Sequence, residues 1–385
     1  MRLAILAAAE RSASSSLDAA MLDGAALASA LKKEGHQVQL TTLPAPTASW
    51  ISRSVAAVET VGMLARLALQ KPAPDAVLMV APPMLPALGA DVVAAARGIP
   101  GAVVLTALTG EARMRTGEFP RDSVEAMLLP ALEAAVVRRA RVLVVPTEAL
   151  RRRVLLRGAQ PDNVKVVRDM FSPLVPKPSA PHVHRLRQEL AQGADCLVVL
   201  PAALGAATDL GALIGGLTRL RHDHAFAFAA VGGGSRARTL REMISARGIK
   251  NAQVVSLARQ DRRAAVLAAD VLLGIAVPAH DGLCVPRAVP RALWSGKPLV
   301  AVGPENSELV SEVRRLGIGP CVGPGDAEGL ATVLRMLTTD VSSRRELASR
   351  AATAGAQAQS PLPGLLGALQ IDDGMPASLM DTSPA

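Results

Sequence analysis

Residues 270–301 read DVLLGIAVPAHDGLCVPRAVPRALWSGKPLVA, and this stretch decides the fold of the C-terminal half of the chain. Residues 271–275 form a short apolar run, which predicts a buried strand. The loop over 277–290 is rich in proline, and a short predicted helix over 291–295 ends at Gly296, a residue typical of helix C-termini. A second strand follows at once. Loops that leave the carboxyl ends of parallel strands bind ligands in open α/β sheets, so we expect a binding site here.

The rest of the chain repeats one pattern, in which short apolar runs alternate with amphipathic segments of helical period. Alternation at this spacing indicates βαβ units and parallel sheets. The pattern stops at a proline-rich segment and then starts again, which divides the 385 residues into two domains. We predict an N-terminal Rossmann-like domain over 1–170, a proline-rich linker over 171–185, a C-terminal Rossmann-like domain over 186–358 and a partly disordered tail over 359–385.

The composition limits the classes of partner. The net charge is +9, which favours anionic ligands such as nucleotide phosphates or anionic lipid. Only 2% of the residues are aromatic, so the chain lacks the rings that stack on bases, and we expect no nucleic-acid partner. The three cysteines and six histidines are scattered, without the spacing of a disulfide framework or a metal site. We therefore expect no metal and no cofactor.

The N-terminus carries an apolar run over residues 3–9, which Glu10 interrupts. This run fits a first buried strand better than a secretory signal. No charge-free apolar stretch reaches the ~18 residues that a transmembrane helix needs. From these features we expect a cytoplasmic protein.

Several segments resemble the GT-B glycosyltransferases, in particular the large retaining group called family 4. They are, in chain order, GHQVQL at 35–40, the runs 74–105 and 139–167, VGGGSRARTLREM from 231, Gly296-Lys297-Pro298 of the opening stretch, and 305–334. The resemblance implies an α/β fold of the GT-B type, in which two doubly wound Rossmann-like domains hold parallel sheets that face each other across a cleft. It also implies that the donor is a nucleotide sugar.

The site residues of the family are substituted in this sequence. The family holds the donor diphosphate with an Arg and a Lys after the first strand of the second domain, but residues 201–209 here contain no cation. The family's Glu at the start of the helix in the opening stretch is replaced by Arg291, with Asp281 in the preceding loop. Arg287 and Arg291 could take over the phosphate contacts, because a guanidinium binds phosphate with two parallel hydrogen bonds. The alternative is that both are surface arginines. The candidates for catalysis are therefore Arg287, Arg291 and Asp281.

Three further segments are candidates for binding the donor. Gly232, Gly233 and Gly234 lie between a predicted strand and a predicted helix, where a phosphate can approach bare backbone, although a tight turn explains them equally well. Lys297 belongs to the Gly-Lys-Pro segment of the resemblance. The loop with Glu305, Ser307 and Glu308 faces the base and ribose of the donor in the family. The alternative for this loop is helix capping, with Asn306 as the N-cap and Glu308 in the first turn.

A cluster of arginines in the N-terminal half predicts a surface near anionic lipid, where each cation contributes about 1 kcal/mol. Its members are Arg138, Arg139, Arg141, Arg151, Arg152, Arg153 and Arg157. The amphipathic segment over 50–71 could add an interfacial helix. The alternative is that these are solvated helix faces. Because the family acts on lipid-linked acceptors, we expect a peripheral location on the inner face of the membrane.

Two hypotheses for the function remain open. In the first, the protein is a glycosyltransferase that moves a sugar from a nucleotide-sugar donor to a lipid-linked or polysaccharide acceptor during cell-envelope glycan synthesis. In the second, it is a pseudo-glycosyltransferase without donor chemistry, which serves as partner or regulatory subunit of an active glycosyltransferase. Binding of a nucleotide sugar favours the first hypothesis, and a neighbouring gene for a complete transferase favours the second.

Overall fold

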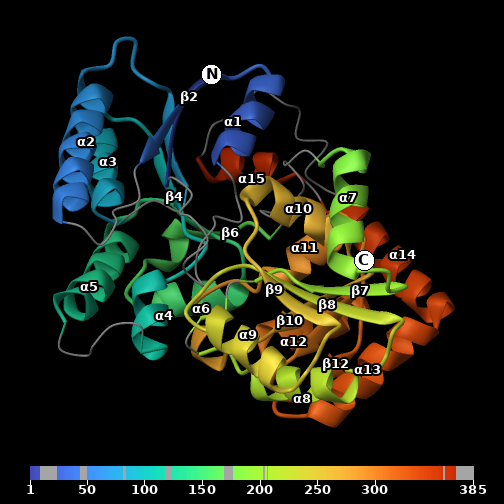
Figure 1. The fold of residues 1–385 in the computed structure, drawn as a ribbon. Helices are drawn as coiled ribbons and strands as arrows, with labels where there is room; N and C mark the ends of the chain where they lie inside the picture. Colours follow the sequence, from blue (N-terminus) through green and yellow to red (C-terminus); the bar gives the residue numbers. More distant parts are fainter. Residues whose placement is uncertain are drawn as a thin grey trace.

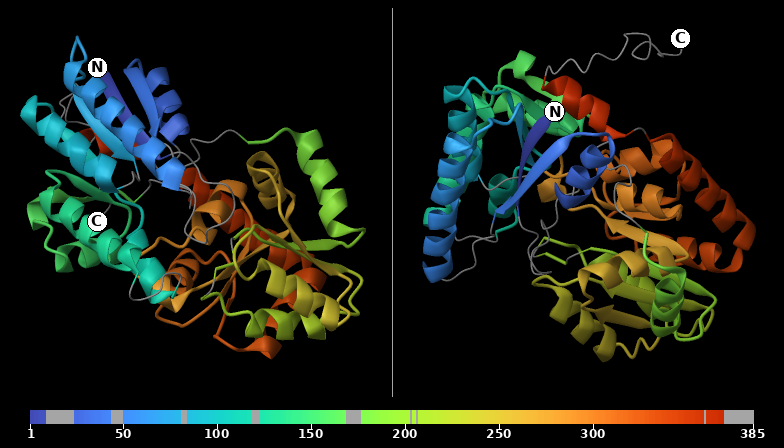
Figure 2. Two further views of the ribbon diagram at one scale, coloured as in Figure 1. Left: turned by 60° about the vertical axis from the view of Figure 1, so that its left-hand side comes forward. Right: turned by 90° about the horizontal axis from the view of Figure 1, so that it is seen from above.

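The computed structural model describes residues 1–8, 24–43, 50–80, 84–117, 123–168, 177–202, 204–205, 207–358 and 360–369. Within these residues the chain forms two domains, each built on a parallel sheet with helices on both faces (Figures 1 and 2). The predicted fold class is thereby confirmed. Residues 171–176 of the predicted linker, and the predicted tail from residue 370 onward, lie outside the described residues.

The N-terminal domain holds a six-stranded sheet in the order β2-β1-β3-β4-β5-β6, and its strand pairs are parallel. The strands are β1 (Arg2–Ala8), β2 (Gln37–Leu43), β3 (Ala76–Val80), β4 (Gly101–Val104), β5 (Leu143–Val145) and β6 (Val164–Val166). The helices are α1 (Gly24–Lys33), α2 (Trp50–Leu69), α3 (Met84–Ala96), α4 (Thr109–Arg115), α5 (Val124–Arg139), α6 (Glu148–Leu156) and the short 3₁₀ helix η1 (Pro161–Asn163).

The C-terminal domain holds a second six-stranded parallel sheet in the order β12-β11-β10-β7-β8-β9. Its strands are β7 (Cys196–Leu200), β8 (Phe226–Val231), β9 (Ala252–Val255), β10 (Val271–Ile275), β11 (Leu299–Val302) and β12 (Cys321–Val322). Its helices are α7 (Ala180–Ala191), α8 (Gly211–Arg219), α9 (Ala237–Ala246), α10 (Arg259–Ala268), η2 (Pro278–His280), α11 (Ala288–Ser295), α12 (Glu308–Leu316), α13 (Ala327–Thr339) and α14 (Val341–Gln357).

The strands are continuous apolar runs because helices cover both faces of each sheet. Every residue of β3, β4, β7 and β8 is buried. In the C-terminal domain, α8, α9 and α13 pack on one face and α7, α10, α11, α12 and α14 on the other. In the N-terminal domain, α2, α3 and α5 cover one face, while α1 covers the other.

The predicted domain boundaries differ from the structure at two places. The helix α7 begins inside the predicted linker, and it packs against α10 of the C-terminal domain. The predicted tail contains a further helix, α15 (Pro361–Ala368), which returns to the N-terminal domain. Leu362 and Leu365 of α15 are buried together with Ile5 and Leu27, and Figure 1 shows α15 beside α1. The end of the described chain therefore completes the core of the first domain.

Candidate functional site

The strand order of the C-terminal sheet reverses between β7 and β10, and this is the place where open α/β sheets bind ligands. Arg291 lies at that point. It belongs to α11, which follows the loop after β10 and ends at Gly296, a residue with a left-handed backbone at φ +64°. The Nη1 atom of Arg291 donates to the carbonyl oxygen of Pro201, the first residue after β7. One side chain thus spans the ends of the two strands.

The surroundings of Arg291 are positively charged. Burial is the main cause that lowers the pKa of Arg291 to about 9, and the charges of Arg287 and Arg262 contribute to the same shift. Within the part of the chain that the structure describes, no carboxylate forms an ion pair with Arg291. A desolvated cation beside other cations is unfavourable unless an anion joins them. The arrangement is therefore suited to an anionic ligand with more than one charge.

The glycine run after β8 packs against the loop after β7. The N–H of Leu204 donates to the carbonyl of Gly233 at 2.8 Å, and the N–H of Arg236 donates to the carbonyl of Leu204 at 3.0 Å. Gly234 has φ +111°, and a Cβ atom there would lie 2.2 Å from the carbonyl oxygen of Leu204. Close backbone packing accounts for Gly234, while contact of Gly232 and Gly233 with a phosphate stays a prediction.

The loop after β11 starts α12, and Ser307 rather than Asn306 is its N-cap. The Ser307 hydroxyl accepts from the N–H of Val310 at 3.4 Å and donates to the carbonyl of Pro304 at 2.7 Å. The expectation that Asn306 caps this helix is wrong by one residue. Glu305 is exposed and forms an ion pair with Arg314 of α12. Neither Ser307 nor Glu305 needs a ligand to account for its position.

Glu308 and Asp281 lie together at the boundary between the domains. Oδ1 of Asp281 accepts from the backbone N–H of Glu308 at 3.0 Å. The side chain of Glu308 bonds Thr147, the N-cap residue of α6 in the N-terminal domain. The pKa of Glu308 is raised to about 7, chiefly by burial. The Thr147 hydrogen bond and the charge of Arg152 lower it, and the charges of Asp281 and Glu312 raise it. This carboxyl group therefore changes charge near neutral pH.

We expect the pH dependence of stability to change in the Glu308→Gln variant. The folded state raises the pKa from 4.5 to about 7, so protonated Glu308 stabilises the fold below about pH 4.5, and this contribution is lost as pH rises towards 7. A shift of this size corresponds to about 3 kcal/mol. Urea unfolding at pH 5 and pH 8 measures this change. The free energy of unfolding of Glu308→Gln should exceed that of the wild type at pH 8 but not at pH 5. Exposed Glu305→Gln is the control, and equal behaviour of both variants would contradict the assignment.

Lys297 lies at the other edge of the sheet. It precedes β11, and the charges that act on it are those of Asp270, just before β10, and Arg187 of α7. Burial lowers its pKa, and Asp270 opposes the effect. Asp270 also forms an ion pair with Arg187 at 2.7 Å. A residue that precedes a parallel strand lies at the amino edge of the sheet, whereas the loops that follow the strands lie at the carboxyl edge. The predicted grouping of Lys297 with Arg291 and Glu308 is therefore corrected.

Two features of the site were missed in the sequence. Arg262, in the first turn of α10, lies with Arg287 near Arg291. The signal in the sequence that could have found Arg262 is its place near the start of a predicted helix.

Arg157, a member of the predicted lipid-facing cluster, is instead mostly buried and forms ion pairs with Glu111 and Glu133. It is therefore not a cation of an exposed basic surface.

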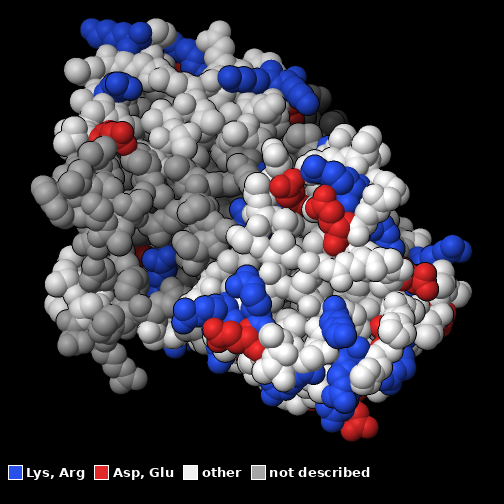
Figure 3. All heavy atoms as spheres, viewed as in Figure 1, with Lys and Arg blue, Asp and Glu red and all other residues white. Residues whose placement is uncertain are grey.

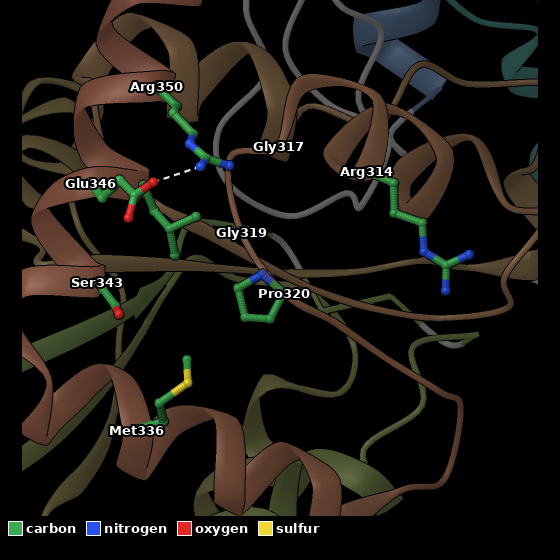
Figure 4. A pocket seen from close by; sticks show the side chains of 9 residues that line it. Arg314, Gly317, Gly319, Pro320, Met336, Ser343, Glu346 and Arg350 are labelled. Atoms are coloured by element: carbon green, nitrogen blue, oxygen red, sulfur yellow. Dashed lines mark hydrogen bonds and ion pairs between the residues drawn. The ribbon is translucent and has the colours of Figure 1, made fainter.

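A surface pocket of about 440 Å³ lies elsewhere, next to the start of β12 (Figure 4). Arg314, Pro320, Met336 and Arg350 line it, and Arg350 forms an ion pair with Glu346 at 2.6 Å. Because Pro320 precedes a strand, this pocket lies at the amino edge of the sheet, away from Arg291. Among the described residues no group of three or more His, Cys, Asp or Glu side chains is arranged to hold a metal ion.

Comparison with solved structures places this architecture among known folds. The Anabaena protein HepE in complex with UDP-glucose is 15% identical over 96% of this chain and 98% of its own, with a TM-score of 0.65. Sucrose-phosphate synthase from Thermosynechococcus elongatus is 14% identical over 96% and 97%, with a TM-score of 0.68. WaaG, a glycosyltransferase involved in lipopolysaccharide biosynthesis, is 16% identical over 95% and 99%, with a TM-score of 0.63.

This chain has the GT-B fold. The agreement extends over both domains, since each of these structures covers at least 95% of the chain. No protein-family model matches the sequence, and no curated protein is significantly similar to it. At 14–16% identity the likeness establishes the GT-B fold alone.

Proposed function

We propose that this protein binds a nucleotide sugar at the end of β7 and β10 and transfers the sugar to an acceptor. The observation that carries the proposal is the desolvated guanidinium of Arg291, which pairs with no carboxylate among the described residues and lies beside Arg287 and Arg262. A nucleoside diphosphate supplies the missing negative charges. The same cations would stabilise the charge that develops on the departing nucleotide, and this stabilisation is what such a transfer requires.

A titration calorimetry panel tests this function. The wild-type protein is titrated with UDP-, GDP- and ADP-sugars, with free phosphate as a probe of non-specific anion binding. We expect micromolar affinity for one nucleotide class and at least 100-fold weaker binding of phosphate, because several contacts act together. Release of free nucleotide in the presence of a lipid-linked acceptor would establish transfer. Absence of binding to every nucleotide sugar would refute the proposal.

The acceptor that fits this chain best is linked to a lipid, because three neighbouring helices of the N-terminal domain expose apolar stripes. The α3 helix packs against both α2 and α5. Their exposed apolar residues are Val58, Val61 and Leu69 of α2, Leu85 and Val92 of α3, and Val124, Met127 and Leu128 of α5. Arg138, Arg139 and Arg141 are exposed at the end of α5. Figure 3 shows that charged side chains are sparse over the described part of this domain on the face viewed and numerous over the C-terminal domain.

An apolar face beside cations is the surface that a membrane with anionic lipid attracts. Among the described residues no helix is both long and apolar enough to cross a membrane. The proposed contact is therefore peripheral, and it would bring a lipid-linked acceptor to the side of the N-terminal sheet. A peripheral contact of this kind also supports a role of the sugar transfer in cell-envelope glycan synthesis.

We expect the Met127→Glu variant to lose most of its binding to anionic vesicles. Met127 is 70% exposed, so a charge there costs little stability in water but opposes insertion into lipid. Co-sedimentation with phosphatidylglycerol–phosphatidylcholine vesicles at low salt should fall on the order of tenfold. The control is Met336→Glu on α13, which is 41% exposed in the C-terminal domain. If both variants sediment like the wild type, this face does not contact lipid.

The alternative is a protein that keeps the fold without the chemistry and acts as a partner of an active glycosyltransferase. It is favoured by Ser307 and Gly234, whose positions are explained by capping and packing, and by the arginine at position 291. In that case the protein binds no nucleotide sugar, or binds one without releasing nucleotide. The calorimetry panel and the release assay therefore separate the two functions.

A further inference from the structure

The segment between η2 and α11 leaves its own domain and enters the core of the other. The side chain of Leu283 is fully buried within the cluster that contains Leu105, Leu108 and Leu150 of the N-terminal domain. Cys284 packs partly on the same cluster. Both residues belong, by sequence, to the loop after β10 of the C-terminal sheet. One leucine of the second domain is thus a core residue of the first.

Backbone hydrogen bonds fix the same contact. The N–H of Leu108 donates to the carbonyl of Leu283 at 2.8 Å, and Ala107 pairs with Cys284 in an antiparallel bridge. Ala107 and Leu108 lie in the short segment between β4 and α4, so the contact joins the carboxyl edges of the two sheets. A buried apolar side chain and a backbone pair together make a specific docking, whereas contacts between domains of one chain are usually more polar than this.

The loop that presents Leu283 is itself compact. The N–H groups of Leu283 and Cys284 both donate to the carbonyl of His280, at 2.9 and 3.0 Å. Gly282 adopts φ +69°, a left-handed conformation that other residues rarely take, and so turns the chain towards the N-terminal domain. Asp281 ties the loop to the start of α12 through the N–H of Glu308. The segment cannot move freely while Leu283 stays docked.

We propose that residues 281–284 latch the two domains together and thereby position the arginines that follow them. Only two residues separate Cys284 from Arg287, and Arg291 is one helical turn further. Leu283 is then a positioning residue, since it touches the N-terminal domain and acts on a ligand only through Arg287 and Arg291. Separation of the domains would withdraw Leu283, free the loop and displace the cationic group. The part of this proposal that concerns ligand affinity rests on the proposed function, whereas the latch itself does not.

Hydrogen exchange of the full-length chain tests the latch without any ligand. In Leu283→Ala, the amide of Leu108 should lose its protection, and peptides covering 105–112 and 278–290 should exchange on the order of 100-fold faster. The rest of both sheets should stay protected. Small-angle scattering of the same variant should show a larger radius of gyration. The matched control is Leu334→Ala, a buried leucine in the core of the C-terminal domain.

The two variants separate a latch from ordinary packing. If Leu283→Ala and Leu334→Ala accelerate exchange in the same peptides, or if Leu283→Ala leaves scattering and exchange unchanged, the latch is refuted. Should Leu283→Ala fail to fold, the milder Leu283→Val is expected to show the same local pattern with a smaller increase. Titration with UDP-glucose gives the second readout, in which Leu283→Ala should bind at least tenfold more weakly although every arginine is retained. If the wild type does not bind UDP-glucose, the same titration is made with the GDP- and ADP-sugars. Absence of binding to all of them would count against the proposed function, while exchange and scattering would still decide the latch.

Discussion

Replacement of Arg291 by alanine is expected to weaken the binding of the preferred nucleotide sugar by about 30-fold or more. The guanidinium lies where the sheet order reverses, and burial has removed much of its water, so a phosphate contact there is strong. Removing one partner of a buried charged contact costs about 2–5 kcal/mol, which corresponds to a loss of 30-fold or more. Titration calorimetry of the wild type and the variant measures the change directly.

Two further variants show whether shape or charge is responsible. Arg291→Lys keeps the positive charge but loses the planar pair of donors, so we expect it to recover only part of the affinity. Arg187→Ala removes a partly buried arginine from the opposite edge of the same domain, where it pairs with Asp270. It should reduce stability and leave nucleotide affinity within about twofold. Equal losses in Arg187→Ala and Arg291→Ala would mean that the effect comes from general destabilisation.

The architecture could be predicted from the sequence because it depends on local patterns. Apolar runs such as Val271–Ile275 are buried on both faces of a sheet, and their alternation with helices implies parallel strands. The α15 helix escaped prediction for the opposite reason. Its apolar residues pack against β1 and α1, more than 300 positions earlier in the chain, and no local pattern reports such a contact. The docking of Leu283 in the N-terminal core is hidden likewise, because its partners are far away in the sequence.

The candidate site was predicted less completely than the fold. The sequence points to Arg291 because it stands where the family has a Glu, and to Arg287 because it could supply a missing phosphate contact. The structure brings both together with Arg262. Lys297 was grouped with them by its neighbours in sequence, although its place before β11 already assigns it to the opposite edge. The roles of Ser307 and Gly234 depend on single hydrogen bonds and on one backbone approach. Such details follow from tertiary packing and not from residue type.

The Glu133→Ala variant is expected to lose about 3–5 kcal/mol of stability in the N-terminal domain. Glu133 of α5 is 1% exposed, and its carboxylate accepts from the N–H groups of Gly110 and Glu111 at 2.6 and 3.2 Å and from the Thr109 hydroxyl at 3.3 Å. These donors form the first turn of α4, which has no other side-chain cap. Arg157 lies 3.5 Å away and is mostly buried. Truncation would leave the donors and part of this cation without a partner.

Denaturant unfolding measures the loss, and Glu133→Gln separates its causes. The amide keeps one acceptor for the helix start but not the charge for Arg157, so we expect a loss of about 1–2 kcal/mol. Glu312→Ala removes an exposed carboxylate that pairs with Arg315, and it should cost under about 0.5 kcal/mol. Because Thr109 follows Leu108 directly, Glu133→Ala should also expose the Leu108 amide to exchange, as Leu283→Ala does. If Glu133→Ala lowers stability but leaves that amide protected, the start of α4 does not support the contact between Leu108 and Leu283 of the second domain.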